Sequence, residues 1–340
     1  MATIKDIARL SGYSIGTVSR VINSHPDVSE AARQKIEQVI RETGFQPNSN
    51  AKLLKQTTTS AVTILVKGTK NIFLETILEE IQELLRVHRE AVNVVFLDEL
   101  ADEVETAVQL CAERRPKGLI FLGANPDYLK KSFGEITVPA VLVSGDSSDL
   151  DFANLSSFCT DDFQAAKDAV GYLLKAGHTK IGIVGGMGER AHGNVGADRL
   201  YGAVEKLEEN NISFDRERFY EQSKFSAENG YEATYKLLSR NPEITALFAL
   251  SDTVAIGAMR AARDLGLRVP EDLSLIGFDG IEYSRYSVPR LTTVEQRSSL
   301  MASRSVEDLL LRLNYSRPAV HEKIPYRILE GESVRNLKNS

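Results

Sequence analysis

The sequence predicts an α/β protein with a small helical head at its N-terminus, and two patterns carry this prediction. Over residues 3–44, apolar side chains recur at helical spacing in three short segments, which is typical of a compact three-helix head. From residue 60 onward, short apolar runs alternate with amphipathic segments, which is typical of parallel sheets covered by helices on both faces. The length of 340 residues allows about two domains of ordinary size.

Signals at their ends predict the first two helices. Thr3 can cap the first helix, and Asp6 three residues later gives a pattern similar to a capping box. Gly12 can adopt the positive φ that ends this helix. Ser14 can then cap a second helix, because its hydroxyl can accept the backbone N–H of Thr17. Two helices joined by so short a turn predict a helix-turn-helix.

The second helix has an inner and an outer face. Val18, Val21 and Ile22 share the face that can pack inward. The opposite face carries Ile15, Gly16, Ser19 and Arg20. A third helix is expected from a cap at Ser29 to a stop at Gly44, which closes the head. The helix-turn-helix DNA-binding domain is therefore expected over residues 1–46.

The head carries a family resemblance. Residues 2–8 (Ala-Thr-Ile-Lys-Asp-Ile-Ala) and 17–23 (Thr-Val-Ser-Arg-Val-Ile-Asn) resemble the opening signature of the lactose/galactose repressor (LacI/GalR) family of bacterial transcription regulators. The alternative is a helical hairpin that touches no DNA. The resemblance implies DNA contacts from Thr3, Ser14, Ile15, Gly16, Thr17, Ser19, Arg20, Asn23 and His25.

A short apolar and basic segment follows the head. Pro47 breaks the preceding helix, and residues 51–55 can form only one or two helical turns, which are marginal alone. An ordinary linker is the alternative. The resemblance implies that residues 47–59 are a hinge helix and linker, in which the hinge orders on DNA and pairs with its dimer mate. The matching residues are Ala51 for close pairing, Leu54 as a minor-groove wedge, and Lys52 and Lys55 for phosphate or groove contacts.

The remaining chain, residues 60–340, is expected to form the effector-binding and dimerisation domain. Strands are predicted at 62–66, 92–97, 118–122, 140–143, 181–184, 246–250 and 273–276. Helices are predicted at 73–87, 103–115, 163–176, 196–209, 227–239, 253–265 and 298–313. The resemblance implies two doubly wound parallel-sheet subdomains of the periplasmic-binding-protein type. Their expected extents are 61–160 with 292–320, and 162–290 with 321–340.

Ligands of open α/β sheets bind beyond the carboxyl ends of the strands, and a crevice between two subdomains supplies such ends from both sides. Asp279 directly follows a predicted strand, and Arg199 opens the helix after another. A carboxylate and a guanidinium there can each hold hydroxyl groups in bidentate fashion. Alternatively, Arg199 pairs with Asp198 or Glu205, and Asp279 braces a turn.

The resemblance and the strand ends together give the effector-binding candidates Phe73, Ser144, Asp146, Asp161, Arg190, Arg199, Ser251, Asp252, Asp279 and Gln296. Asp161 and Asp252 also stand at helix starts, and capping is the favoured role for Asp252. Many sugar-binding members have Asp where this chain has Ser144, with Asp146 two residues later.

Composition and motifs argue against several other classes of protein. The net charge is −6, of which residues 1–56 contribute +3 and the remainder −9, which suits a chain whose head alone meets phosphate. No apolar run approaches ~18 residues, so no membrane span is expected. The five histidines show no metal-ligand spacing, and the glycine-rich segment 182–188 lacks a phosphate-loop ending. We expect no cofactor, no metal and no enzymatic activity.

These observations predict a cytoplasmic, homodimeric transcription regulator, most simply a repressor. Its partners would be double-stranded operator DNA and a small effector, a sugar or sugar derivative. The alternative is the solute-binding protein of a sugar transporter, which shares the fold of the body. The DNA-binding head and the missing signal peptide favour the regulator.

Overall fold

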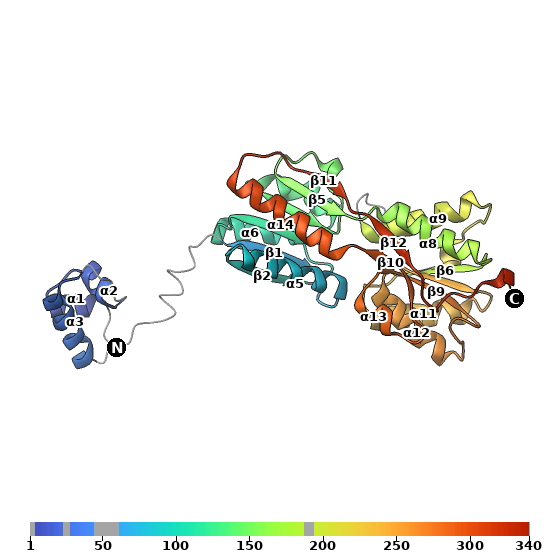
Figure 1. Cartoon of the computed structure of the whole chain (residues 1–340), viewed down its shortest axis with the longest axis horizontal. Coiled ribbons are helices and arrows are strands. Elements are labelled where there is room, and N and C mark those ends of the chain that lie inside the picture. The colour runs from blue at the N-terminus through green and yellow to red at the C-terminus, as the bar shows by residue number, and fades with distance from the viewer. Residues whose placement is uncertain (1–3, 23–27, 44–60, 187–193, 340) are drawn as a thin grey trace. The chain divides into compact units, whose positions relative to one another are not determined.

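The computed structural model describes residues 4–22, 28–43, 61–186 and 194–339 (Figure 1). The chain forms two compact units, Met1–Thr59 and Ser60–Ser340. The first unit contains α1 (Ile4–Ser11), α2 (Ile15–Ile22) and α3 (Glu30–Thr43). None of the described helices is long and apolar enough to cross a membrane.

The three helices of the head pack around a small apolar core. Ile7, Val18 and Ile36, one from each helix, are fully buried in it. The predicted turn between α1 and α2 is confirmed, because Gly12 has a φ of +75° and the amide of Thr17 donates to Ser14 Oγ at 3.1 Å. The core therefore fixes the angle between the two helices of the predicted helix-turn-helix.

The second unit contains two six-stranded sheets, which confirms the predicted α/β class (Figure 1). The first sheet has the order β11-β5-β4-β3-β1-β2 and is parallel throughout. Its strands are β1 (Val62–Lys67), β2 (Val92–Leu97), β3 (Gly118–Leu122), β4 (Ala140–Val143), β5 (Leu155–Cys159) and β11 (His321–Lys323). Its helices are α5 (Ile72–Val87), α6 (Glu103–Arg114), α7 (Pro126–Ser132) and α14 (Ser298–Asn314). We call this sheet with its helices the first subdomain.

The second sheet has the order β12-β10-β9-β8-β6-β7, with only the β10–β12 pair antiparallel among its named pairs. Its strands are β6 (Ile181–Val184), β7 (Tyr220–Glu221), β8 (Ala246–Ala249), β9 (Ser274–Asp279), β10 (Thr292–Gln296) and β12 (Tyr326–Leu329). Its helices are α8 (Asp162–Lys175), α9 (Val195–Glu209), α10 (Arg216–Phe219), α11 (Ala227–Arg240), α12 (Asp252–Asp264) and α13 (Glu282–Tyr286). We call this sheet with its helices the second subdomain.

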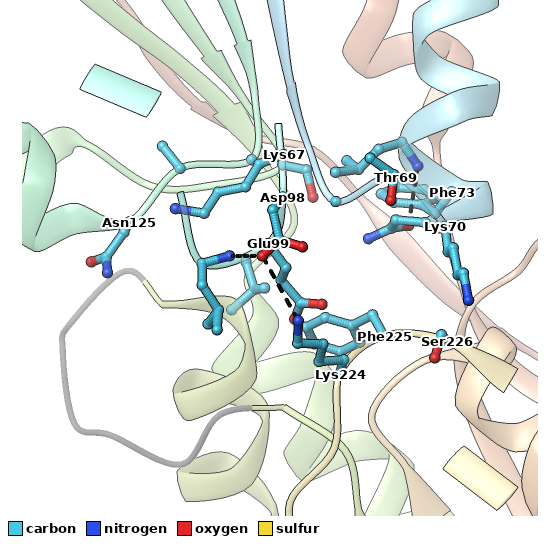
Figure 2. A pocket seen from close by; sticks show the side chains of 18 of the residues that line it. Lys67, Thr69, Lys70, Phe73, Asp98, Glu99, Asn125, Lys224, Phe225 and Ser226 are labelled. Atoms are coloured by element: carbon cyan, nitrogen blue, oxygen red, sulfur yellow. Dashed lines mark hydrogen bonds and ion pairs between the residues drawn. The ribbon is translucent and has the colours of Figure 1, made fainter. Parts of the chain in front are cut away.

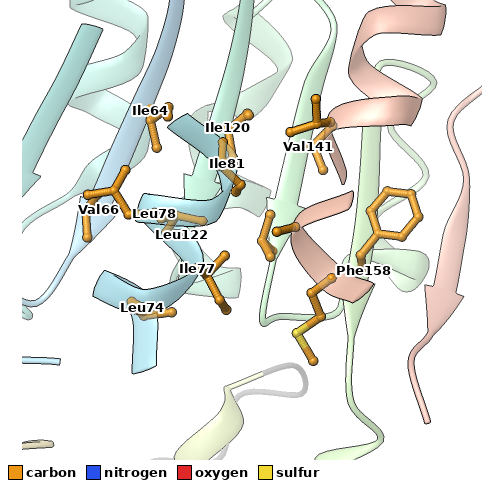
Figure 3. Close-up of a cluster of buried hydrophobic side chains, with 14 of the residues drawn as sticks. Ile64, Val66, Leu74, Ile77, Leu78, Ile81, Ile120, Leu122, Val141 and Phe158 are labelled. Carbon is orange, nitrogen blue, oxygen red and sulfur yellow. The ribbon is translucent and has the colours of Figure 1, made fainter. Parts of the chain in front are cut away.

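Each sheet is covered by helices on both faces, as parallel sheets require. In the first subdomain, α5 and α14 cover one face and α6 and α7 cover the other. Figure 3 shows Ile77 and Ile81 of α5 packed against Ile64 and Ile120 of the sheet. In the second subdomain, α8 and α9 cover one face, and α11 and α12 the other. The two sheets are therefore rigid platforms for the loops at their strand ends.

The boundaries between the subdomains differ from the expected ones. Residues 292–296 were assigned to the first subdomain, but they form β10 beside β9 in the second sheet. Residues 321–323 were assigned to the second subdomain, but they form β11 beside β5 in the first sheet. The crossings come after β10 and after β11, because Thr293 and Val294 are already buried in the second sheet before the chain crosses into α14.

Candidate functional site

The described side chains of the helix α2 divide into an exposed and a buried face. Arg20 and Gly16 are exposed, whereas Val18 and Val21 are buried against the other helices. Ser14 Oγ lies 2.9 Å from Thr17 Oγ1, which fixes the start of the helix. The described part of the outer face of α2, Gly16 and Arg20, is therefore exposed to solvent. The candidates Thr3, Asn23, His25, Ala51, Lys52, Leu54 and Lys55 lie outside the described residues, as do the side chains of Ile15 and Ser19.

A cavity of about 390 Å³ is lined by both subdomains of the second unit (Figure 2). Its volume is within the range of roughly 300–1,000 Å³ that is usual for small-ligand pockets. The helices α5, α7, α9 and α11 all begin at its wall, with N-caps at Asn71, Asn125, Asn194 and Ser226. The cavity thus lies at the carboxyl ends of the strands, where parallel sheets bind ligands.

Arg199 forms the centre of a buried polar cluster in the wall of the cavity. Its Nε donates to Asp162 Oδ1 at 2.7 Å, and its Nη1 donates to the carbonyl of Leu250 at 2.6 Å and to Asp279 Oδ1 at 3.3 Å. The guanidinium also lies 3.7 Å from the centroid of the Phe278 ring. Arg199 is only 3% exposed, so these contacts hold it rigidly.

Asp279 is held by partners from two elements. Besides Arg199, the amide nitrogen of Gln296 donates to Asp279 Oδ1 at 2.8 Å. Its φ of +120° is strained for a residue other than glycine, and such strain is concentrated at functional sites. Burial raises the pKa of Asp279 to about 6, against the opposing charge of Arg199. Burial likewise raises the pKa of Asp162.

Gln296 is only 4% exposed, yet its amide oxygen has no hydrogen-bond partner among the described residues. An unpaired buried acceptor is costly, so this atom is available to a donor that the protein itself does not supply. Gln296 contacts Asp279, which lines the cavity.

A second polar cluster forms the cavity wall in the first subdomain. Lys67 Nζ is paired with Glu103 and donates to the carbonyl of Ala101 at 3.0 Å. Glu103 Oε1 accepts the amide of Asn125 at 2.5 Å, and the Lys67 ammonium lies 4.8 Å from the Tyr128 ring centroid. Lys67 is the last residue of β1, and Asn125 lies three residues after the end of β3. None of these residues was among the candidates predicted from the sequence, although the strand-end rule that predicted Asp279 applies to Lys67 and Asn125 equally.

Comparison with known proteins shows the family. Residues 3–48 match the model of the bacterial regulatory proteins of the lacI family, and residues 170–334 match the periplasmic binding protein-like domain. The chain is 38% identical over 337 residues to the HTH-type transcriptional regulator MalR of Clostridium butyricum, covering 98% of this chain and 99% of that one. The chain belongs to the lacI family.

Two solved structures of lacI-family regulators match nearly the whole chain. The transcriptional regulator CelR in complex with cellobiose has a TM-score of 0.70 at 25% identity, covering 98% of this chain and 100% of that one. The lac repressor dimer bound to operator and the anti-inducer ONPF has a TM-score of 0.68 at 27% identity, covering 98% and 99%. This chain is therefore a transcription regulator with a helix-turn-helix head, and the comparison favours it over a transporter's binding protein.

The predicted effector residues of this lacI-family chain fall into four groups. Phe73, Ser144, Arg199 and Asp279 line the cavity. Gln296 is not among the lining residues but contacts one of them. Arg190 lies outside the described residues. The remaining four candidates, Asp146, Asp161, Ser251 and Asp252, are not among the lining residues and are engaged within the protein.

Asp161 and Ser251 each accept a backbone hydrogen bond close by in the sequence. Asp161 Oδ1 accepts the amide of Gln164 at 3.0 Å, and Ser251 Oγ accepts that of Val254 at 3.2 Å. Both side chains therefore cap the helices that they precede, α8 and α12.

Asp252 does not cap its own helix, contrary to the favoured prediction. It is fully buried, and Oδ2 accepts the amides of Gly280 and Ile281 at 2.8 and 2.9 Å, while Oδ1 accepts the hydroxyl of Thr293 at 2.6 Å. Burial and the nearby Asp279 raise its pKa, and these three hydrogen bonds oppose the rise. Asp252 thus braces the turn that carries Asp279.

Asp146 is paired with a residue of the late strand β11. Lys323 Nζ lies 2.7 Å from its Oδ2, and the amide of Ser148 donates to its Oδ1 at 2.9 Å. Burial alone would raise the pKa of Asp146, but these contacts lower it to about 2. The carboxylate therefore ties the loop after β4 to the edge strand of the first sheet.

Proposed function

We propose that this regulator represses transcription as a cytoplasmic homodimer whose head binds operator DNA, under the control of a small hydroxyl-rich effector bound in the cavity between the subdomains. The observation that carries the proposal is the position of the cavity: strand ends and helix N-termini of both subdomains meet there. A ligand that contacts both walls binds with different affinity to different relative positions of the subdomains. Regulation requires this difference in affinity between two conformations.

The proposed DNA contact is the outer face of α2 in the major groove. Arg20 is the long cationic side chain of that face and fits a bidentate contact to a guanine. Gly16 permits close approach, and Ile15 offers only apolar contact with a thymine methyl group. Leu54 is the proposed minor-groove wedge of the hinge. The structure of the lac repressor dimer bound to operator supports this assignment by similarity.

The chemistry of the cavity wall favours a ligand with many hydroxyl groups. The described lysine and arginine side chains that line it (Lys67, Lys70, Arg199 and Lys224) are each paired with a carboxylate. Asn71, Asn125 and Asn194 use their side-chain oxygens as helix caps, which leaves the amide N–H groups as donors. Carboxylates and amides together can both accept from and donate to hydroxyls. The cellobiose in the CelR structure supports a sugar by similarity.

The proposed mechanism is a linkage between two equilibria. The effector favours one relative orientation of the subdomains, and this orientation changes the free energy with which the paired hinges order on DNA. Effector and operator then change each other's affinity by the same factor.

A thermal-shift screen of sugars, phosphosugars, nucleosides and purines tests the effector. A ligand at 100 times its dissociation constant stabilises the folded protein by about 2.7 kcal/mol. We expect a neutral sugar to be the strongest hit and Asp279→Asn to weaken it about tenfold or more, because a charged hydrogen bond contributes about 1.5–3 kcal/mol. Asp272→Asn, at an exposed pair with Arg268, is the matched control. A hit of equal affinity in both variants would remove Asp279 from the site.

Selection of binding sites from a random DNA pool tests the DNA contact. We expect Arg20→Ala to relax the preference at one base of each half-site, at a cost of about 1–3 kcal/mol. Arg41→Ala, at the exposed end of α3, should leave the selected sequence unchanged. A uniform loss of affinity across all sequences would instead make Arg20 a phosphate contact.

A further inference from the structure

Two ion pairs join the subdomains at the cavity. Lys70 Nζ, in the loop after β1, lies 3.2 Å from Glu228 Oε2 at the start of α11. Asp98 Oδ1, directly after β2, lies 3.7 Å from Lys224 Nζ, just before α11. Figure 2 shows Lys70, Asp98 and Lys224 at the cavity. Both contacts therefore link the first subdomain to one segment of the second, residues 224–228.

The signs of the four charges are reciprocal. The first subdomain supplies a cation at Lys70 and an anion at Asp98, and the second supplies an anion at Glu228 and a cation at Lys224. Sliding one wall against the other would replace attraction by repulsion, so the pairs favour one register of the two walls. Glu99 lies beside them with a pKa raised by burial, and it accepts the amide of Phe225 across the cavity.

The exposure of these pairs suits a contact that opens and closes. Lys70 and Glu228 are each 70% exposed, so water can solvate both charges when they separate. The pair Lys67–Glu103, within the first subdomain, is 12% and 1% exposed, and separating it would leave a buried charge. An exposed pair stabilises only weakly, so it can shift the ratio of two conformations without locking the protein in either of them.

The subdomains also share an apolar contact, which the ion pairs complement. Ile281 of the second subdomain is 5% exposed and belongs to the core cluster of the first, and Ile256 of α12 packs against the same cluster. This contact is insensitive to the sign of any charge. The ionic and apolar contributions to closure can therefore be separated by salt and by charge reversal.

We propose that Lys70–Glu228 and Asp98–Lys224 form a latch that holds the two walls of the cavity together when no effector is bound. Only one consequence of the latch rests on the proposed function. A weaker latch would lower the fraction of protein that is closed and able to bind effector, and so would lower the apparent effector affinity. Closure itself needs neither effector nor DNA, so it is testable in their absence.

The test is the distance between the subdomains in the effector-free full chain, measured by electron–electron double resonance. Spin labels are placed at Lys130→Cys on α7 and Glu232→Cys on α11, both exposed positions, in a Cys111→Ser background. Lys70→Glu and Glu228→Lys should each lower the closed-to-open ratio about three- to tenfold, because repulsion replaces an exposed pair. The double reversal should restore the wild-type distance distribution.

Recovery in the double variant distinguishes the latch from a local effect. Glu228 is in the first turn of α11, where an acidic side chain also stabilises the helix. Glu228→Lys removes this stabilisation in the single and in the double variant alike, so recovery in the double variant must come from the restored ion pair. The control Arg86→Glu breaks the pair Arg86–Glu83 within α5 and should leave the distances unchanged. Single reversals with wild-type distances, or a double reversal without recovery, would overturn the proposal. Neither outcome would bear on whether the cavity binds an effector.

Discussion

Replacing Arg199 by alanine would leave two buried carboxylates without their cation. Asp162 and Asp279 both lose a charged hydrogen bond, and the carbonyl of Leu250 loses its donor. Arg199 is the only Lys or Arg within 4.0 Å of either carboxylate among the described residues. The substitution therefore perturbs the fold of the second subdomain as well as the wall of the cavity.

The expected cost follows from the burial of the cluster. Removing one partner of a buried ion pair destabilises by about 3–5 kcal/mol, because the other charge remains uncompensated. With about 2–4 °C per kcal/mol for a domain of this size, the melting temperature should fall by about 6–20 °C. The double variant Arg199→Met with Asp162→Asn should recover part of this loss, since it removes charges from both sides of the pair.

Calorimetric melting of the full chain measures this effect. Arg260→Ala is the control, because Arg260 is 71% exposed and pairs with Asp264 on the surface of α12. We expect this control to cost less than about 1 kcal/mol. If Arg199→Ala lowers the melting temperature no more than the control does, the buried cluster does not stabilise the subdomain and the reasoning fails.

Three further predictions concern separate regions of the chain. Because burial raises the pKa of Asp279 from 3.8 to about 6, the folded state holds a proton that the unfolded chain releases, so stability should fall as the pH rises through this window. Denaturant unfolding at pH 4 and 7.5 tests this. Between these pH values the free energy of unfolding of the wild type should fall by up to about 3 kcal/mol more than that of Asp279→Asn, and an equal change in the two proteins would contradict the prediction. Gly257→Ala should destabilise by several kcal/mol in the same assay, since its Cβ would lie 2.1 Å from the carbonyl of Ala227, whereas Gly134→Ala, with open space around it, should be neutral. Leu54→Ala should weaken operator binding in fluorescence anisotropy at fixed salt without changing effector affinity, and unchanged operator affinity would exclude the wedge.

Local signals were sufficient for the elements whose determinants are close in sequence. The cap at Ser14 and the turn at Gly12 depend on neighbours within a few residues, and both were predicted correctly. The strand β5 was missed, because its residues Ser156 and Ser157 are buried and polar. Their hydroxyls bond to Arg312 and His321, which are more than 150 positions away, so no local pattern could reveal why a strand tolerates them.

The candidate site shows the same limit. The strand-end rule predicted the position of Asp279 correctly. For Arg199, however, the sequence suggested only the nearest acids on its own helix as partners, namely Asp198 and Glu205. The structure instead pairs Arg199 with Asp162, 37 positions away on α8. Which acid meets which base depends on how helices pack over a sheet, and one sequence does not contain that information.

The most direct test of the proposed regulation is the affinity for operator DNA with and without the effector. Fluorescence anisotropy at one fixed salt concentration would measure it for wild type and for Asp279→Asn, using the sugar found by thermal shift. We predict that saturating sugar changes the wild-type affinity by about 5- to 150-fold, and that operator changes the sugar affinity by the same factor. Asp279→Asn should bind operator as wild type does and respond only at about ten- to a hundredfold higher sugar concentration. An operator affinity that stays the same at saturating sugar would contradict control of DNA binding by the cavity.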